Sequence, residues 1–222
     1  MVVLRGIQGH SKGLISAGRN IECDFAQNAR LEAQESVIVK DFLVNSYVFC
    51  NHLEAVEGHG SIVGGEVYAR RIVDVLAIGS KAGTATTVSA GTDYLIRRSM
   101  AEIEELIGFC DGNIKKIDAT LRPILAALKN NQSQDFPRRE LINQTVEKRR
   151  ALAHRKEMLR AKHEHLKAKL LVDGHCFIRV RRSCYSDVRL KIREAKTVIR
   201  LERQNLRFYE DRETETIETA PY

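Results

Sequence analysis

Hydrophobic and polar residues alternate in four short segments of the first ninety residues, and these segments align with one another. Each segment reads apolar, variable, small, then a turn of two or three residues, then apolar, variable, and small or apolar. Alternation with a period of two is typical of a strand that buries one face. The segments begin at Ile15, Leu31, Val48 and Val67, so successive repeats are 16, 17 and 19 residues long.

The recurring small residue distinguishes two kinds of β structure. A coil of short parallel strands needs a small side chain at the same tight interior position of every turn, whereas a flat sheet does not. Left-handed hexapeptide coils repeat in sixes, which these spacings do not. We therefore predict a right-handed parallel β-helix, with an antiparallel sandwich as the alternative. The expected interior positions are Ala17, Ala33, Cys50 and Ala69, with Ile21, Val37, Leu53 and Ile72 beside them.

Glycines gather between the third and fourth segments, at Gly58, Gly60, Gly64 and Gly65. We expect corners of the coil there, because a corner often requires a positive φ, which glycine adopts without strain. The surrounding sequence GHGSIVGG matches neither common phosphate-loop motif, and GSKAGT runs directly into a strand-like segment. A phosphate-binding loop is therefore the disfavoured interpretation of this stretch.

From Ile96 the period changes to that of a helix. Apolar residues then recur with alternating spacings of four and three as far as Leu128, a pattern that predicts a coiled coil. Turn-forming residues occupy positions 130–135, and a second helix is predicted from about Arg138 to Leu171. Its seam has leucines seven residues apart that alternate with polar residues. The seam positions are Leu152, Leu159 and Leu166, with Arg149, Lys156 and His163.

Two helices joined by a short turn run antiparallel, and the sequence predicts their alignment. If the numbers of facing residues sum to about 273, Ile107 meets Leu166 and Leu121 meets Leu152. Glu104 is then expected near Lys167, and Asp111 near Arg160. Exposed ion pairs of this kind add little stability, so they would select the alignment more than hold it.

Strand-like alternation returns after Gly174. Because the helical arm ends where it began, we expect the last strands to extend and cap the same β-body. The predicted division is residues 1–92 for the β-helix, 93–171 for an inserted antiparallel coiled-coil hairpin, and 172–222 for the strands that complete the β-body. The expected strands are Phe177–Val180, Val188–Ile192, Thr197–Leu201 and Leu206–Phe208.

The net charge of +7 is concentrated in one part of the chain. Residues 138–169 hold 11 Lys and Arg against 4 Asp and Glu, which accounts for the whole excess. Such a basic segment can meet an acidic protein, a nucleic acid or an anionic membrane, or can simply face solvent. The candidate partner-binding residues are Arg149, Arg150, Arg155, Lys156, Lys162 and Lys169.

The sequence contains no strong pattern for a catalytic site or a metal site. The five cysteines lack metal-type clustering and suggest reduced thiols, as expected in a cytoplasmic protein. His163 and His165 point to different sides of one helix, so joint chelation is disfavoured. No acid–base pair or catalytic triad is evident. We therefore expect no enzyme, no catalytic residue, no cofactor and no metal site.

Three stretches resemble the bacterial flagellar assembly protein A family, and together they extend over most of the chain. They are KGLISAGRNIECDFAQNARLEAQESVIV, NSYVFCNHLEAVEGHGSIVGGEVYA and IGSKAGTATTVSAGTDY, the last leading into the helical segment. The family carries a Tyr-Pro-Gly-Val turn where this chain has Tyr185 to Val188 as Tyr-Ser-Asp-Val. The family also usually has upstream rungs and a further domain, so a fragment with an exposed strand edge near Val2–Ile7 is one expectation.

The resemblance implies a non-enzymatic cytoplasmic scaffold connected with flagellar assembly or polar organisation, and no catalytic residues. We expect an acidic cytoplasmic protein partner for the basic arm. Homo-oligomerisation through the β-helix edge or the coiled coil is a further candidate. The alternative function is binding of nucleic acid or an anionic membrane through the second helix. We rank it lower because that helix lacks the aromatic residues that stack on bases or seat in an interface.

Overall fold

The computed structural model describes residues 2–3, 5–130, 136–171 and 174–221 of the 222-residue chain. The chain divides into two compact units, one made of residues 1–94 with 170–222 and the other of residues 95–169. Of the turn expected at positions 130–135, Asn130 is the last residue of a helix, and positions 131–135 lie outside the described residues, as does Asp173.

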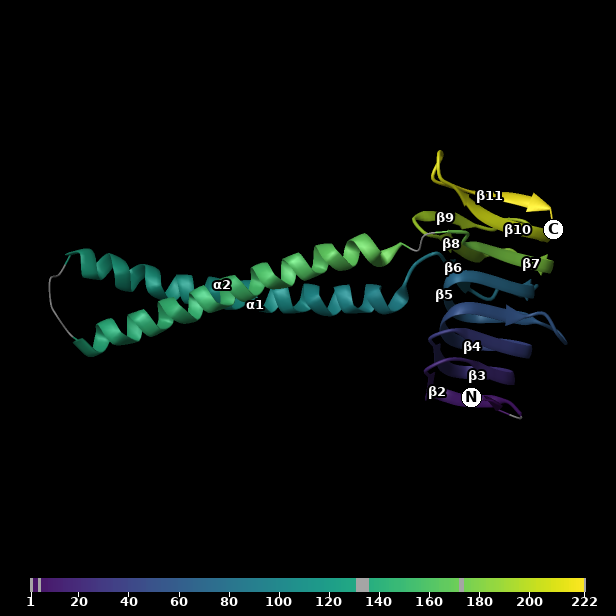
Figure 1. Cartoon of the computed structure of the whole chain (residues 1–222), viewed down its shortest axis with the longest axis horizontal. Coiled ribbons are helices and arrows are strands. Elements are labelled where there is room, and N and C mark those ends of the chain that lie inside the picture. The colour runs from purple at the N-terminus through teal and green to yellow at the C-terminus, as the bar shows by residue number, and fades with distance from the viewer. Residues whose placement is uncertain (1, 4, 131–135, 172–173, 222) are drawn as a thin grey trace. The chain divides into compact units, whose positions relative to one another are not determined.

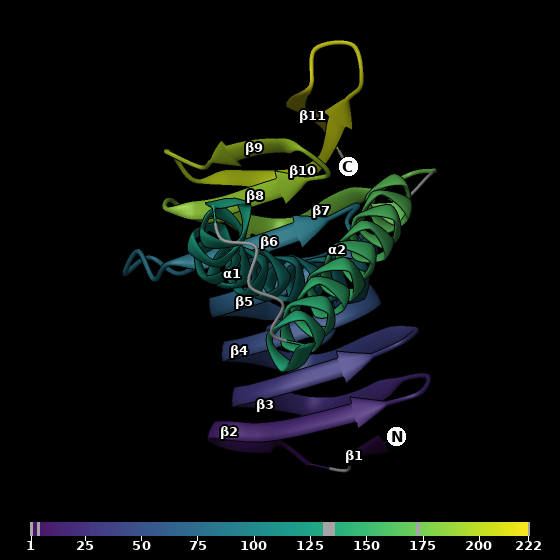
Figure 2. The same ribbon diagram turned by 90° about the vertical axis from the view of Figure 1, so that its left-hand side faces the viewer.

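The first unit is a β-solenoid in which the successive strands between Ile7 and Ala90 each pair in parallel with the next along the chain (Figure 1). Figure 2 shows these strands stacked one above another. The short strand β1 (Val2–Val3) also pairs in parallel with β3. The stacked strands are β2 (Ile7–Ala17), β3 (Ile21–Ala33), β4 (Ser36–Ala55), β5 (Ser61–Ile78) and β6 (Thr86–Ala90).

The strand register confirms the repeat predicted from the sequence. Ile15 pairs with Leu31, Leu31 with Val48, and Val48 with Val67. The small positions align as well, because Ala17 pairs with Ala33 and Cys50 with Ala69. Leu31, Val48 and Val67 are buried almost completely, and burial of each such side chain contributes about 1.5–3 kcal/mol. The core therefore runs along the axis of the coil.

One predicted core position is wrong by a single residue. Leu53 pairs with Val73, and Ile72 instead pairs with His52, after a register shift between Cys50 and His52. Val73 is fully buried, whereas Ile72 is only half-buried. The two segments differ in turn length at this point. A shift of one residue in a strand turns every following side chain to the opposite face.

The glycine corners are confirmed. Gly58, Gly60, Gly64 and Gly65 have φ values between +50° and +77°. Asn28 and Asn45 also have positive φ, of 50° and 46°, and asparagine tolerates this conformation better than other non-glycine residues do.

Buried hydroxyl groups satisfy the backbone at these corners. Ser46 Oγ accepts a hydrogen bond from the Ala29 amide at 3.3 Å and donates to the Val44 carbonyl at 2.9 Å. Thr86 Oγ1 does the same between the Gly64 amide and the Thr84 carbonyl. Because an unpaired buried amide is costly, these two side chains allow the chain to turn inside the core.

The C-terminal strands extend and close the solenoid. β7 continues the stack on β5 and β8 on β6, both in parallel. Antiparallel pairing then ends the coil, with β9 on β8, β10 on β7, and β11 on β10. Residues 199–201, expected as part of a strand, lie outside β9, and β11 was not predicted. The bounds are β7 (Phe177–Cys184), β8 (Val188–Ile192), β9 (Ala195–Val198), β10 (Arg203–Asp211) and β11 (Thr216–Pro221).

Two long helices form the second unit, close to the predicted limits. They are α1 (Tyr94–Asn130) and α2 (Phe136–Leu170). Ion pairs between the helices show that they run antiparallel. Pro123 lies inside α1 without dividing it.

The predicted alignment of the two helices is wrong by about one helical turn. Glu104 contacts His163 instead of Lys167, and Asp111 contacts Lys156 instead of Arg160. Each observed partner lies four residues earlier along α2 than expected. The polar residues Arg149, Lys156 and His163 are thus the direct partners of α1 carboxylates.

Candidate partner-binding surface and basic cavity

Three ion pairs at heptad spacing join the described side chains of α1 and α2. Arg149 Nε donates to Asp118 Oδ1 at 2.5 Å, Lys156 Nζ donates to Asp111 Oδ1 at 2.5 Å, and His163 Nε2 lies 2.9 Å from Glu104 Oε1. The hydrogen bond from Lys156 lowers the pKa of Asp111, and the bond from Arg149 lowers the pKa of Asp118. All three pairs belong to one alignment of the two helices.

A reciprocal charge exchange tests this alignment. Asp118→Arg and Arg149→Asp are each expected to lower the melting temperature of the helical signal, because each places like charges together. The double variant is expected to recover it. The matched exchange Asp111→Lys with Arg160→Asp follows the disfavoured alignment, and it is expected to recover less because Lys156 then faces a lysine. Equal recovery by both exchanges, measured by circular dichroism, would contradict the observed alignment.

The six predicted partner-binding residues divide into two groups. Arg149 and Lys156 are held by α1 carboxylates, and Arg150 pairs with Glu147 on its own helix. Arg155, Lys162 and Lys169 are exposed, and they make no ion pair with any residue that the structure describes. Only the second group consists of exposed cations without an ion pair to a described residue.

The second group belongs to one stripe along α2. Positions 148, 155, 162 and 169 recur every seven residues, and all four are exposed Lys or Arg. Met158, with 63% of its surface exposed, and the exposed His165 lie between them on the same face. We call this surface the basic stripe: Lys148, Arg155, Met158, Lys162, His165 and Lys169. The sequence-based prediction did not include Lys148, Met158 and His165, although each lies one residue before a predicted seam position.

Polar and aromatic contacts within the solenoid unit secure the point where α1 begins. The Tyr94 ring stacks on Phe49 with centroids 3.8 Å apart, and Arg70 Nε lies 2.9 Å from the carboxylate of the buried Asp93. The Asp93 amide donates to the Leu170 carbonyl at 3.0 Å, which joins the start of α1 to the end of α2. Residues on both sides of the helical segment are therefore tied to each other.

A second feature of the solenoid unit is a cavity of about 640 Å³. Its lining comes from the segment before β7, the turn between β8 and β9, and the end of β10. The residues that matter for its chemistry are His175, Phe177, Arg193, Arg207, Tyr209 and Arg212.

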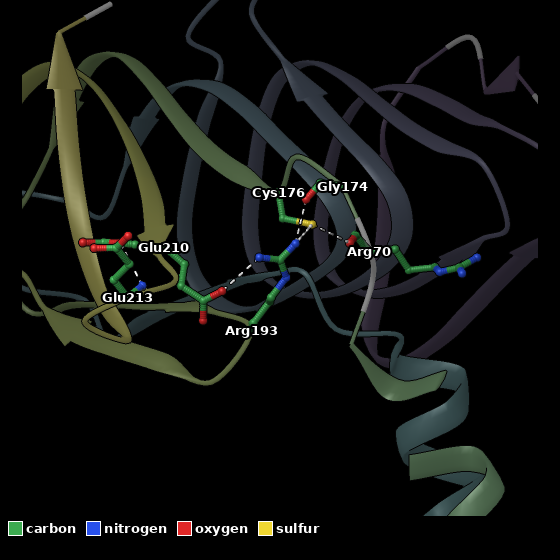
Figure 3. A network of polar contacts seen from close by, with 7 residues as sticks. Arg70, Gly174, Cys176, Arg193, Glu210 and Glu213 are labelled. Atoms are coloured by element: carbon green, nitrogen blue, oxygen red, sulfur yellow. Dashed lines mark hydrogen bonds and ion pairs between the residues drawn. The ribbon is translucent and has the colours of Figure 1, made fainter. Parts of the chain in front are cut away.

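A buried ion pair lies against this cavity (Figure 3). Arg193 Nη1 donates to Glu210 Oε2 at 3.0 Å, and their side chains are only 10% and 9% exposed. Arg193 Nη2 donates to the Gly174 carbonyl at 2.6 Å and lies 3.9 Å from the Cys176 thiol. Figure 3 shows the Arg193 guanidinium between these groups. It links three segments that are far apart in the sequence.

Four of the five cysteines have thiols with raised pKa values. Burial raises the pKa of Cys23 to about 11 and the pKa of Cys50 and Cys184 to about 12. Burial also raises the pKa of Cys176, although Arg193 opposes the shift. A thiol with a raised pKa forms little thiolate, so these residues act as small core side chains.

Metal-ligating side chains do not converge within the described part of the chain: no three His, Cys, Asp or Glu residues there form a group that could hold an ion. Among the same residues, no helix is both long enough and apolar enough to span a membrane.

A β-solenoid closed by antiparallel strands, with two long helices inserted in the sequence between β6 and β7, defines the class of this protein. The chain belongs to a single family over nearly its whole length: the family described as Flagellar Assembly Protein A beta solenoid domain matches residues 1–216. This confirms the resemblance noted in the sequence. Searches of curated proteins and of solved structures found no match.

Proposed function

We propose that this protein is a non-enzymatic cytoplasmic scaffold in flagellar assembly or polar organisation, and that its helix pair binds an acidic protein partner. Membership of the flagellar assembly protein A family supports the general role. The coiled-coil character of the helix pair is part of the proposal.

The basic stripe is the observation that carries this proposal. Arg155, Lys162 and Lys169 remain exposed while Arg149 and Lys156 are used inside the helix pair. The stripe also contains Met158, whose flexible side chain adapts to varied apolar surfaces. Charge around an exposed apolar contact is typical of a protein interface, whose rim is polar and whose centre is apolar.

The test is a pull-down from the source cell. We expect a partner retained by the intact chain to be lost when Arg155, Lys162 and Lys169 are changed to Glu, because an acidic surface would then meet like charge. The matched control changes the exposed Arg97, Lys116 and Arg122 of α1 to Glu and is expected to keep the partner. A further variant replaces residues 95–171 with a short turn. Identical partner sets for the intact chain and this variant would remove the helix pair from the binding function.

The alternative, binding of nucleic acid or an anionic membrane by α2, differs in its response to salt. Each phosphate neutralised should weaken binding by about 0.7–0.9 log unit per log unit of salt. Retention of DNA, RNA or anionic vesicles at low salt, lost in the stripe variant, would favour this alternative over the protein partner.

A further inference from the structure

The cavity beside Arg193 lies in the solenoid unit and has a chemistry separate from that of the basic stripe. Its volume, about 640 Å³, is in the usual range for small-molecule sites and much larger than a phosphate ion needs. A ligand that fills it must therefore have a substantial part besides any charged group.

The charge of the lining is positive. The one carboxylate among the lining residues, Glu210, is already held by Arg193 at 3.0 Å. Arg207, Arg212 and His175 are exposed, and none of them makes an ion pair with a residue that the structure describes. Two guanidinium groups that carry several donors each, with an imidazole beside them, suit an oxyanion such as phosphate.

Two aromatic rings line the same cavity as these positively charged side chains. Phe177 of β7 and Tyr209 of β10 are cross-strand neighbours in the antiparallel register. The Arg207 guanidinium carbon lies 5.8 Å from the centroid of the Phe177 ring and 5.9 Å from that of Tyr209. Cation–π contact at this distance holds the guanidinium against the aromatic surface. The lining thus places aromatic rings beside guanidinium groups, a combination that suits a ligand with both a flat ring and an anionic group.

The buried pair behind the lining gives the site a rigid wall. Arg193 lies in the turn between β8 and β9. It donates hydrogen bonds to Glu210 of β10 and to the carbonyl of Gly174, which lies in the segment before β7. The three segments that supply the lining are therefore cross-linked before any ligand arrives, so their backbone needs little ordering on binding.

We propose that this cavity binds a nucleoside phosphate. Arg207 and Arg212 contact the phosphate groups, His175 adds a donor, and the base lies against Tyr209 and Phe177. A nucleoside phosphate combines a flat ring with oxyanions and is large enough to use this volume.

Isothermal titration of the intact protein with ADP, GDP and UDP tests the proposal, with adenosine and inorganic pyrophosphate as the two halves of the ligand. At least one nucleotide is expected to bind at least about tenfold more tightly than either half, because ring and phosphate contacts are then made together. No binding of any nucleotide at millimolar concentration would overturn the proposal. So would pyrophosphate that binds as tightly as the nucleotides, since it would indicate a simple anion site.

Variants locate the site. Arg207→Gln with Arg212→Gln is expected to weaken nucleotide binding by about tenfold or more, since each charged hydrogen bond that is lost costs roughly that factor. Tyr209→Ala should weaken nucleotide binding by a larger factor than pyrophosphate binding, because Arg207 keeps its contact with the Phe177 ring. The control, Arg182→Gln with Arg200→Gln, removes the same charge from exposed positions outside the lining. If the control weakens binding as much as the cavity variant, the effect is due to net charge and the proposed site is wrong.

Discussion

Replacing Gly65 with alanine is expected to lower the free energy of unfolding by about 3 kcal/mol. Gly65 has a φ of +77°, and a Cβ at this position would lie 2.3 Å from the Ser46 carbonyl oxygen and 2.6 Å from the Ser46 amide nitrogen. Both clashes are with backbone, which cannot move aside as a flexible side chain can. The estimate combines the cost of a strained φ, about 1–3 kcal/mol, with that of overpacking, which is of similar size.

The expected loss follows from the place of Gly65 in the coil. Ser46 bonds to the Ala29 amide in the preceding coil, so a displaced Ser46 disturbs the pairing of three successive strands. Chemical denaturation followed by far-ultraviolet circular dichroism measures the change. Gly18→Ala is the matched control, because a Cβ there meets nothing within 4 Å, and its effect should stay within about 0.5 kcal/mol. Equal unfolding midpoints for the two variants would show that the Gly65 corner is not tightly packed.

Replacing Glu210 with alanine is expected to cost about 3 kcal/mol or more. Removal of one partner from a buried ion pair leaves the other charge without compensation, which is typically worth 3–5 kcal/mol. Arg193 would keep its bond to the Gly174 carbonyl but lose the carboxylate of Glu210. Because that contact links the β8–β9 turn to β10, its loss weakens the closure of the solenoid.

Three companion variants show whether the pair is the cause. Glu210→Gln keeps an acceptor oxygen and should cost less than Glu210→Ala. Glu213→Ala removes a carboxylate from an exposed position and should be close to neutral. The double variant Glu210→Ala with Arg193→Met removes both charges and should recover part of the loss. With Arg193→Met measured alone as well, a double variant as unstable as the sum of Glu210→Ala and Arg193→Met would mean that the two residues are not coupled.

The solenoid could be predicted from the sequence because successive side chains of a strand point to opposite faces. The register of Ile15, Leu31, Val48 and Val67 follows from that alternation together with the returning small residue. The glycines at the corners were also readable, since few other residues adopt a positive φ without strain. The limits of the two helices followed from the change to a heptad period.

The sequence did not predict which residue of β5 enters the core opposite Leu53. Whether a turn of the coil absorbs an extra residue as a bulge or as a longer loop depends on the neighbouring coil against which it packs. That choice placed Val73 in the core and Ile72 outside it.

The alignment of the helices was ambiguous for a related reason. Along α2, Lys156, Arg160, His163 and Lys167 can each face a carboxylate, so sliding one helix by about a turn keeps opposite charges together and leucines near the seam. Patterns that repeat every seven residues are nearly degenerate under such shifts, and local charge cannot choose among them. The basic stripe changes with this choice, because the alignment determines which cations α1 uses.

The cavity depends on contacts between distant parts of the chain. His175 and Phe177 follow the helical segment, Arg193 lies in a later turn, and Arg207 to Arg212 close the solenoid. None of these positions has a local pattern that marks it. Periodic local patterns specified the repeating coil and the two helices, because each residue there packs against neighbours at a fixed sequence spacing. The bulge, the helix alignment and the cavity arise where segments without such spacing meet, so packing between them was the deciding factor.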